Sequence, residues 1–162
     1  MLINAEANAE LGQCTQAVLD QTINLLRDRV DMPHLTTTPV ADPAAINYGY
    51  SVSPLIYEIR RERRIELFAE GYRWDDVSRW NVGEVVFNRV RRGAKMDPNL
   101  YSADEIKTIK DQVGFDADGF ITPYAKRVTY SMNFTAKNYL YNIPLDEISL
   151  NPNLLPQNPG WK

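Results

Sequence analysis

Apolar residues recur at helical spacing in several short segments of this chain, and turn-forming residues separate these segments. The pattern in residues 2–30 predicts two helices around Gly12, the first rich in alanine and the second amphipathic. Ser53 and Pro54 form a typical helix start, because serine caps the first turn and proline suits the first position. Shorter helical patterns follow in 74–80, 81–95 and 99–113, the last with a capping box of Ser102 and Glu105. The chain is therefore predicted to be mainly helical.

Prolines and glycines mark the parts of the chain that are predicted to be irregular. Residues 31–53 contain three prolines and a threonine run, and we expect a loop there. The dipeptide Asp118-Gly119 lies between apolar residues and predicts the turn of a small β-hairpin within 115–130. The last part of the chain holds four prolines. It is predicted to form an extended strap that buried apolar side chains, including Trp161, hold down.

The most distinctive segment runs from 62 to 80 and reads E-R-R-I-E-L-F-A-E-G-Y-R-W-D-D-V-S-R-W. Its glutamates at 62, 66 and 70 are four residues apart, so on one helix they would share a face and repel one another. We expect the arginines at 63, 73 and 79 to neutralise them, and Gly71 to end the helix in a left-handed cap. Trp74 to Trp80 is then predicted to form a second short helix folded back on the first. This ion-paired corner is interpreted as a structural element.

Two long motifs carry a resemblance to a known family. The first matches I-x-x-E-R-x-x-E-L-x-x-E-G-x-R-x-x-D-L-x-R-W at Ile59, Glu62, Arg63, Glu66, Leu67, Glu70, Gly71, Arg73, Asp76, Arg79 and Trp80. The second resembles L-x-P-I-P-x-x-E-I-x-x-N-P-x-L-x-Q-N-P-G-W, and it matches at Leu140, Ile143, Pro144, Glu147, Ile148, Asn151, Pro152, Leu154, Gln157, Asn158, Pro159, Gly160 and Trp161. The departures are Val77 for leucine, Asn142 for proline and one extra residue before Gln157. In these motifs and their order, the chain resembles the C-terminal part of the SusD/RagB family.

The resemblance implies a function and a place in the cell. Members of that family are glycan-binding outer-membrane lipoproteins that take part in nutrient uptake. The intact protein would then be lipid-anchored at the cell surface, with the anchor outside this segment. It would capture an oligosaccharide or another nutrient for a SusC-like TonB-dependent transporter without changing it chemically. Residues 1–30 would be the end of a tetratricopeptide-like helical region, and 31–162 a SusD-like C-terminal subdomain. A helical-repeat scaffold that binds only protein is the alternative.

Composition and charge exclude several other classes. The chain has 162 residues and a formal net charge of -3, which argues against nucleic-acid binding because such proteins usually present a basic face. No apolar run approaches the roughly 20 residues that span a bilayer. A single cysteine rules out an internal disulfide. Leu11 to Cys14 resembles a lipoprotein cleavage box, but the preceding residues are too polar for a signal sequence. We expect Cys14 to be a small buried residue near a helix start.

The sequence offers little for catalysis or for binding a metal or cofactor. Asp75 and Asp76 are adjacent, so on a helix they point to different sides and cannot form the facing pair of a glycosidase. His34 is the only histidine. Asp116 and Asp118 belong to a partial calcium-loop pattern, which lacks the later glutamate and fits a turn equally well. We therefore predict a protein that is not an enzyme and that uses no cofactor or metal.

Aromatic residues are the candidate binding residues. Several tyrosines lie in or beside the predicted loops, where a flat ring with a polar tip can pack on the C–H face of a sugar. Tyr48, Tyr101 and Tyr124 are the first candidates for such a platform, and a place in the core is the alternative for each. The motif tryptophans, among them Trp80 and Trp161, are assigned to packing. The family resemblance transfers no ligand-binding residue to this chain.

Overall fold

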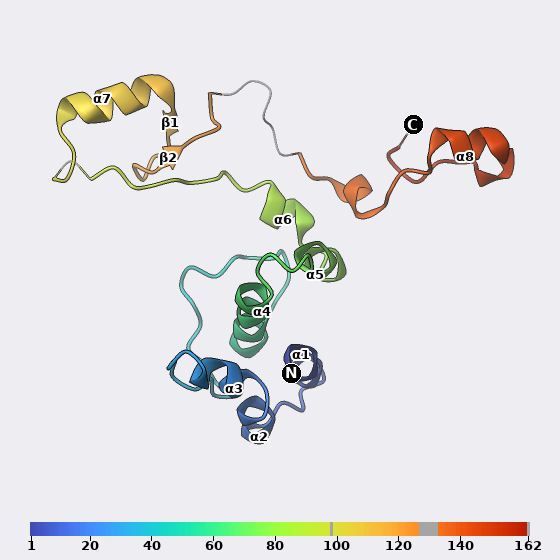
Figure 1. Cartoon of the computed structure of the whole chain (residues 1–162), viewed down its shortest axis with the longest axis horizontal. Coiled ribbons are helices and arrows are strands. Elements are labelled where there is room, and N and C mark those ends of the chain that lie inside the picture. The colour runs from blue at the N-terminus through green and yellow to red at the C-terminus, as the bar shows by residue number, and fades with distance from the viewer. Residues whose placement is uncertain (98, 127–132, 162) are drawn as a thin grey trace. The chain divides into compact units, whose positions relative to one another are not determined.

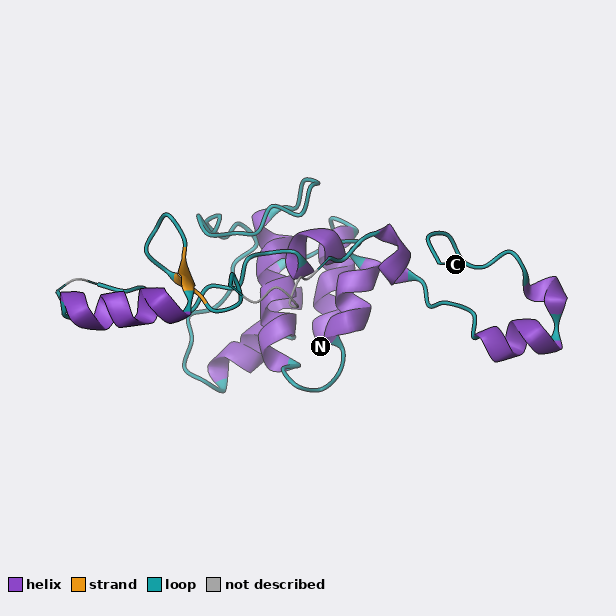
Figure 2. Cartoon of the chain, turned by 90° about the horizontal axis from the view of Figure 1, so that it is seen from above, coloured by secondary structure: helices purple, strands orange, loops and turns teal. Residues whose placement is uncertain are grey.

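The computed structural model describes residues 1–97, 99–126 and 133–161 of the chain (Figure 1). These residues form mainly helices and one two-stranded sheet, drawn in purple and orange in Figure 2. The predicted mainly helical fold with a small hairpin is therefore confirmed. The chain divides into two compact units, Met1–Val82 and Gly83–Lys162. The division predicted after residue 30, which concerns a repeat-like region, stays a prediction.

The first unit contains five helices among its elements: α1 (Leu2–Glu10), α2 (Gln16–Asp20), α3 (Ile23–Asp28), α4 (Pro54–Glu66) and α5 (Arg73–Arg79). Gly12 has a φ of 68° and ends the first helical segment, as its position in the sequence predicted. The second predicted helix is divided in two at Thr22. The Thr22 hydroxyl donates a hydrogen bond to the carbonyl oxygen of Val18 at 2.5 Å, while its backbone leaves the helical region. This local hydrogen bond competes with continuation of the helix.

The core of the first unit lies where α1 packs on α4. Its members are fully or almost fully buried apolar residues: Ala5, Leu19, Ile23, Leu35 and Ile59. A buried asparagine on α3 fixes the loop that follows this helix. The Asn24 side chain accepts a hydrogen bond from the backbone N–H of Leu35 at 2.7 Å and donates one to its carbonyl oxygen at 3.2 Å. The loop therefore enters the core at a defined point although it has no regular structure.

Helix α4 starts where the sequence predicts and ends earlier than expected. The Ser53 hydroxyl accepts a hydrogen bond from the N–H of Ile56 at 3.2 Å, and Pro54 occupies the first turn. The helix ends at Glu66, before a turn in which Ala69 and Gly71 have φ values of 65° and 88°. Glu70 therefore lies outside the helix, and the prediction of three glutamates on one helical face was wrong.

The second unit contains shorter elements, namely α6 (Gly83–Phe87), α7 (Ala103–Gln112), β1 (Gly114–Phe115), β2 (Ile121–Thr122), η1 (Ala136–Tyr139), α8 (Leu145–Leu150) and η2 (Pro152–Leu154). The capping box predicted at the start of α7 is present. The two strands pair antiparallel, with Gly114 opposite Thr122. The side chain of Asp116 closes their turn by accepting hydrogen bonds from the N–H groups of Asp118 and Phe120, both at 3.0 Å. The last part of the predicted hairpin range, 127–130, lies outside the described residues.

The C-terminal tail is not the extended strap that its prolines predicted. Pro144 and Pro152 are far enough apart for the short helix α8 to form between them, because proline is tolerated before and at the start of a helix. Polar contacts hold the rest of the tail. The Gln157 side chain bonds to both the N–H and the carbonyl oxygen of Ile143, at 2.7 and 2.8 Å. The Trp161 indole N–H donates to the carbonyl oxygens of Lys137 and Leu140, at 3.2 and 3.0 Å.

Candidate functional site

A network of buried charges surrounds Trp80 in the first unit. Glu6, which is 4% exposed, accepts hydrogen bonds from the Trp80 indole N–H at 2.7 Å and from both terminal nitrogens of Arg79, at 3.0 and 2.5 Å. Asp76, which is 2% exposed, accepts from the Nε of Arg63 at 2.8 Å and also from Arg79. The Arg60 guanidinium lies 4.6 Å from the centre of a Trp80 ring. The indole is therefore enclosed by paired charges.

The predicted neutralising partners were wrong for most of the charged row. Glu62 pairs with Arg27 of α3, whose Nε donates to Oε1 at 2.7 Å. Glu66 pairs with Arg29 at 2.7 Å. Arg73 makes no ion pair within the described residues, and it lies 5.9 Å from the Trp80 ring centre. Glu62 and Glu66 thus each bind an arginine more than 30 positions away in the sequence, which helical spacing within one segment could not reveal.

Arg73 is the arginine of this region whose pKa burial lowers. Desolvation is the main cause that lowers the pKa of its guanidinium, and the nearby Arg64 adds to the effect. The carboxylates of Glu6, Glu62 and Asp76 are instead occupied by other guanidinium groups and by the indole. These contacts connect α1, α3, α4 and α5 to one another.

A cluster of tyrosines lies beside this network. The ring centres of Tyr50 and Tyr57 both lie 6.0 Å from that of Tyr48, in tilted arrangements. The turn that presents them contains Gly49 at a φ of 84°, and the Asn47 side chain accepts a hydrogen bond from its N–H at 2.8 Å. The three rings line a cavity of about 190 Å³, together with Ala41, Asp42, Ala45, Ile46, Asn47, Val52 and Pro54. We call this space the tyrosine cavity.

Hydrogen bonds fix two of the three tyrosine hydroxyls. Tyr50 donates to the carbonyl oxygen of Trp80 at 2.8 Å and accepts from Arg60 at 3.0 Å. Tyr57 accepts from the N–H of Ile46 at 3.2 Å. The hydroxyl of Tyr48 has no hydrogen-bond partner within the ranges that the structure describes, and the residue is 9% exposed. Burial raises the pKa of Tyr48. Its hydroxyl therefore stays protonated at neutral pH and can donate a hydrogen bond.

The chemistry of the tyrosine cavity suits a sugar ring better than a charged or wholly apolar ligand. Aromatic faces can pack on C–H groups, and the Asn47 amide and the Asp42 carboxylate can bind hydroxyls. Its volume of about 190 Å³ is below the roughly 300–1,000 Å³ of drug-sized ligand sites. The cavity can therefore take one ring of an oligosaccharide. Of its tyrosines only Tyr48 was a sequence candidate. The Tyr-Gly-Tyr turn was the signal for Tyr50, whereas Tyr57 gave no signal on its helix.

The other two sequence candidates lie in the second unit. Tyr101 is 37% exposed and comes just before the capping serine of α7. Tyr124 is 39% exposed and follows β2, where it lines a separate cavity with Thr122 and two arginines. Tyr101 is not among the residues that line this cavity. A role for Tyr48, Tyr101 and Tyr124 in ligand binding stays a prediction.

The partial calcium pattern forms a turn whose carboxylates are already bound. Arg92 contacts Asp116 through its Nε at 2.5 Å and Asp118 through a terminal nitrogen at 2.6 Å. Partial burial alone would raise the pKa of Asp116, but the N–H of Phe120 and the Arg92 guanidinium lower it overall. Across the described ranges, no group of three His, Cys, Asp or Glu residues is arranged to hold a metal ion. The turn interpretation therefore accounts for these residues.

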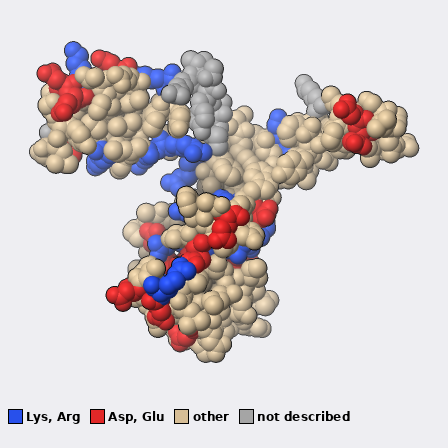
Figure 3. Space-filling view, viewed as in Figure 1, with Lys and Arg blue, Asp and Glu red and all other residues tan. Residues whose placement is uncertain are grey.

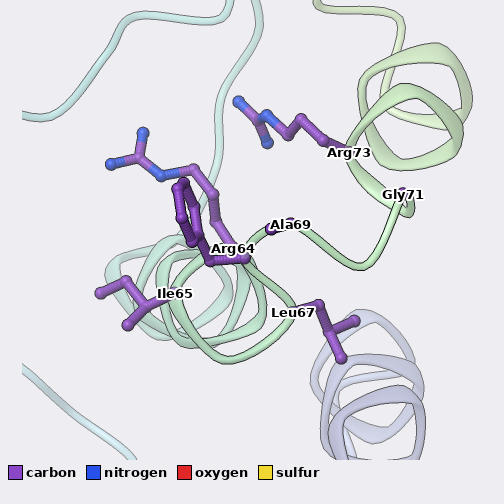
Figure 4. A pocket seen from close by; sticks show the side chains of 7 residues that line it. Arg64, Ile65, Leu67, Ala69, Gly71 and Arg73 are labelled. Carbon is purple, nitrogen blue, oxygen red and sulfur yellow. The ribbon is translucent and has the colours of Figure 1, made fainter.

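A wider apolar groove lies after α4. Its volume is about 950 Å³, and Figure 4 shows the side chains around it. Apolar side chains line most of it, and Phe68 is 83% exposed there. The lining residues are Arg64, Ile65, Leu67, Phe68, Ala69, Gly71 and Arg73. This groove has few of the polar groups that sugar hydroxyls require.

Comparison with known proteins decides the family. The sequence model of the SusD family matches residues 1–161. The chain belongs to the SusD family. This SusD-family chain is 37% identical over 81 residues to SusD-like protein P38 of Formosa agariphila, an alignment that covers 50% of the chain and 15% of that protein. It is 28% identical over 161 residues to SusD-like protein P2 of the same organism, covering 99% of the chain and 24% of that protein.

A solved structure agrees with this assignment. A SusD-like carbohydrate-binding protein from Bacteroides fragilis matches the chain with a TM-score of 0.63 and 29% sequence identity. The match covers 93% of the chain and 26% of that protein. The SusD-family chain thus spans about a quarter or less of the relatives it matches. Within the described residues, no helix is both long enough and apolar enough to cross a membrane.

Proposed function

We propose that this chain belongs to a surface glycan-binding protein of an outer-membrane uptake system. The intact protein captures an oligosaccharide and passes it unchanged to a SusC-like TonB-dependent transporter, while a lipid anchor holds it to the outer membrane. The observation that carries the proposal is the SusD-family match over residues 1–161, together with a solved relative described as carbohydrate-binding. The transporter, the anchor and the cell-surface location are proposed from the family resemblance.

The tyrosine cavity is the proposed sugar contact of the first unit. The hydroxyls of Tyr50 and Tyr57 are held by backbone and arginine contacts, so these two rings are positioned before a ligand arrives. The Tyr48 hydroxyl and the amide and carboxylate of Asn47 and Asp42 supply the polar contacts that orient a sugar. Tyr101 and Tyr124 are proposed as further contacts in the second unit. This arrangement favours recognition over chemistry.

Binding without catalysis follows from the same residues. A glycosidase needs two carboxyl groups that flank the scissile bond. Asp76 is enclosed by Arg63 and Arg79 and is 2% exposed, so it is not accessible to a substrate. Asp75 is its neighbour in α5 and points to another side of that helix. We therefore propose that the protein releases bound glycans without cleaving them.

A glycan array followed by titration calorimetry tests the proposal. The Tyr48→Phe variant removes only a hydroxyl that has no partner in the described part of the chain. It should weaken binding of the best array ligand by about threefold to tenfold, the value of one neutral hydrogen bond, and leave the melting curve at neutral pH unchanged. Tyr141→Phe is the matched control because Tyr141 is 76% exposed. Absence of binding to every glycan on the array would overturn the proposal.

The alternative function, a scaffold that binds only protein, draws support from the apolar groove after α4. Its exposed Phe68 and Ile65 are typical of protein contacts rather than sugar contacts. The same array separates the two functions, because the scaffold predicts no glycan ligand at all. A Phe68→Ser variant that keeps full glycan affinity would assign the groove to a contact other than the sugar.

A further inference from the structure

A small cavity of about 180 Å³ lies in the second unit, beside the extended segment that follows α6. It is lined by Asn88, Arg89, Val90, Arg91, Thr122, Tyr124 and Ala125. Its volume is again below that of a drug-sized ligand site, so one sugar ring or one ionic group fits. We call it the arginine cavity. It differs from the tyrosine cavity in its charge.

Backbone hydrogen bonds hold the two walls of the arginine cavity together. The N–H of Gly93 donates to the carbonyl oxygen of Ile121 at 2.7 Å. The N–H of Ile121 donates to the carbonyl oxygen of Ala94 at 3.0 Å. A bridge between Lys95 and Phe120 continues this pairing. The segment with the arginines is thus fixed against β2 and the residues that follow it. The cavity therefore exists without a ligand.

The two arginines that line this cavity have no counter-charge among the residues that the structure describes. Residues 89–95 read R-V-R-R-G-A-K, with four basic residues and no acidic one. Arg92 is bound by the hairpin carboxylates. Arg89 and Arg91, which line the cavity, form no ion pair within the residues that the structure describes. Figure 3 shows basic side chains gathered along this extended segment. Two arginines therefore line one small cavity without an acidic partner in the described part of the chain.

Two further side chains of the cavity are suited to a sugar. Thr122 is 4% exposed, and its hydroxyl is buried without a hydrogen-bond partner in the described ranges. Such unpaired buried groups are rare in folded proteins and need an explanation. Tyr124 is 39% exposed and supplies an aromatic face. The two arginines, the Thr122 hydroxyl and the Tyr124 ring together match a saccharide that carries an anionic group.

We propose that the arginine cavity binds the anionic group of an acidic saccharide, with Arg89 and Arg91 holding a carboxylate or a sulfate ester. The planar guanidinium group matches both anions, because it can donate two parallel hydrogen bonds to their oxygens. Tyr124 packs on the ring that carries the anion. The inference rests on the proposed glycan-binding function and narrows its ligand to charged glycans.

Calorimetry of the chain with matched saccharides tests the inference. The probes are tetragalacturonate and its methyl ester, a sulfated galactan tetrasaccharide and its desulfated form, and inorganic sulfate alone. At least one acidic probe should bind about tenfold or more tightly than its neutral form, which corresponds to about 1.4 kcal/mol. The carboxylate and sulfate pairs show which anion is preferred. Binding of inorganic sulfate as tight as that of the acidic saccharide would overturn the saccharide assignment.

Charge variants locate the effect. The double variant Arg89→Gln, Arg91→Gln should lose the preference for the acidic probe and keep the affinity for its neutral form. Double replacement by lysine should restore part of the preference, since lysine keeps the charge but not the planar geometry. Lys107→Gln on the exposed face of α7 is the control and should change nothing.

The outcomes separate the inference from the function on which it rests. Equal affinity for acidic and neutral probes, unchanged in the double glutamine variant, would refute anion recognition while glycan binding stands. No binding of any saccharide, here and on the array, would refute the proposed function and the inference together. Circular dichroism of each variant verifies that the fold is retained.

Discussion

Glu6 is the residue whose replacement tests the charged network most directly. It lies on α1, is 4% exposed, and accepts hydrogen bonds from Trp80 and Arg79. The Nε of Arg60 lies 3.4 Å from it and has no other partner in the described structure. A Glu6→Gln substitution keeps the shape of the side chain but removes its charge. It therefore leaves the Arg60 guanidinium with less compensation in the interior.

The expected loss of stability depends on how far each charged partner of Glu6 is exposed. Removing one partner of a buried ion pair costs about 3–5 kcal/mol. The Arg79 side chain is 44% exposed, so water screens the pair of Arg79 with Glu6. This pair therefore contributes little to the loss of stability. We therefore expect the lower end, about 3 kcal/mol, mainly from the loss of the charge that faces Arg60. In a unit of this size that corresponds to a decrease in Tm of about 12 to 24 °C.

Urea denaturation and thermal melting followed by circular dichroism measure this change. Glu10→Gln is the matched control, because Glu10 also binds Arg60, at 2.9 Å, but its side chain is 47% exposed. Exposed pairs contribute about 0.2–1 kcal/mol, so this variant should melt close to the parent chain. If the two variants lose equal stability, the burial argument is wrong and the network does not hold the helices together.

Two more predictions concern the first unit. Arg63→Ala should lower the free energy of unfolding by about 3–5 kcal/mol because it leaves Asp76 buried without its main partner. Arg73→Ala, which breaks no ion pair within the described residues, should cost clearly less in the same urea experiment, and equal costs would contradict the assigned partners. Burial raises the pKa of Tyr48 in the folded chain. The stability that comes from its protonated form is therefore fully present below about pH 10, the pKa in the unfolded chain, and is lost as the pH rises through the folded-state pKa. Tyr48→Phe should therefore unfold less readily than the parent chain in alkaline melting experiments, and identical alkaline transitions would refute this.

Local features of the fold could be predicted because their causes lie within a few residues. Ser53 with Pro54 starts α4, and Ser102 with Glu105 starts α7, since a cap needs only its own turn. Asp118-Gly119 forms its turn for the same reason. The early end of α4 was missed because Ala69 adopts a positive φ that alanine rarely takes.

Partners that are distant in the sequence could not be predicted. Helical spacing placed Glu62 and Glu66 on one face, but their arginines are contributed by α3 and the residue that follows it. Tyr48 was predicted from its loop, whereas the rings that enclose it depend on how α4 packs against that loop. The same holds for Arg89 and Arg91, which lie within the helical pattern predicted for 81–95, whereas α6 ends at Phe87. Their cavity exists because β2 pairs with the segment that carries them.

The long-range ion pairs also predict how the sequence can vary. Glu6 and Arg79 are 73 positions apart, Arg27 and Glu62 are 35 apart, and Arg63 and Asp76 are 13 apart. A lone change at one member leaves the other charge buried without its partner, whereas a joint change to two apolar residues is often tolerated. Across related chains, these positions should therefore be substituted in pairs. Exposed Glu10 should vary independently of Arg60, so the pattern of joint substitution would map the buried network without a structure.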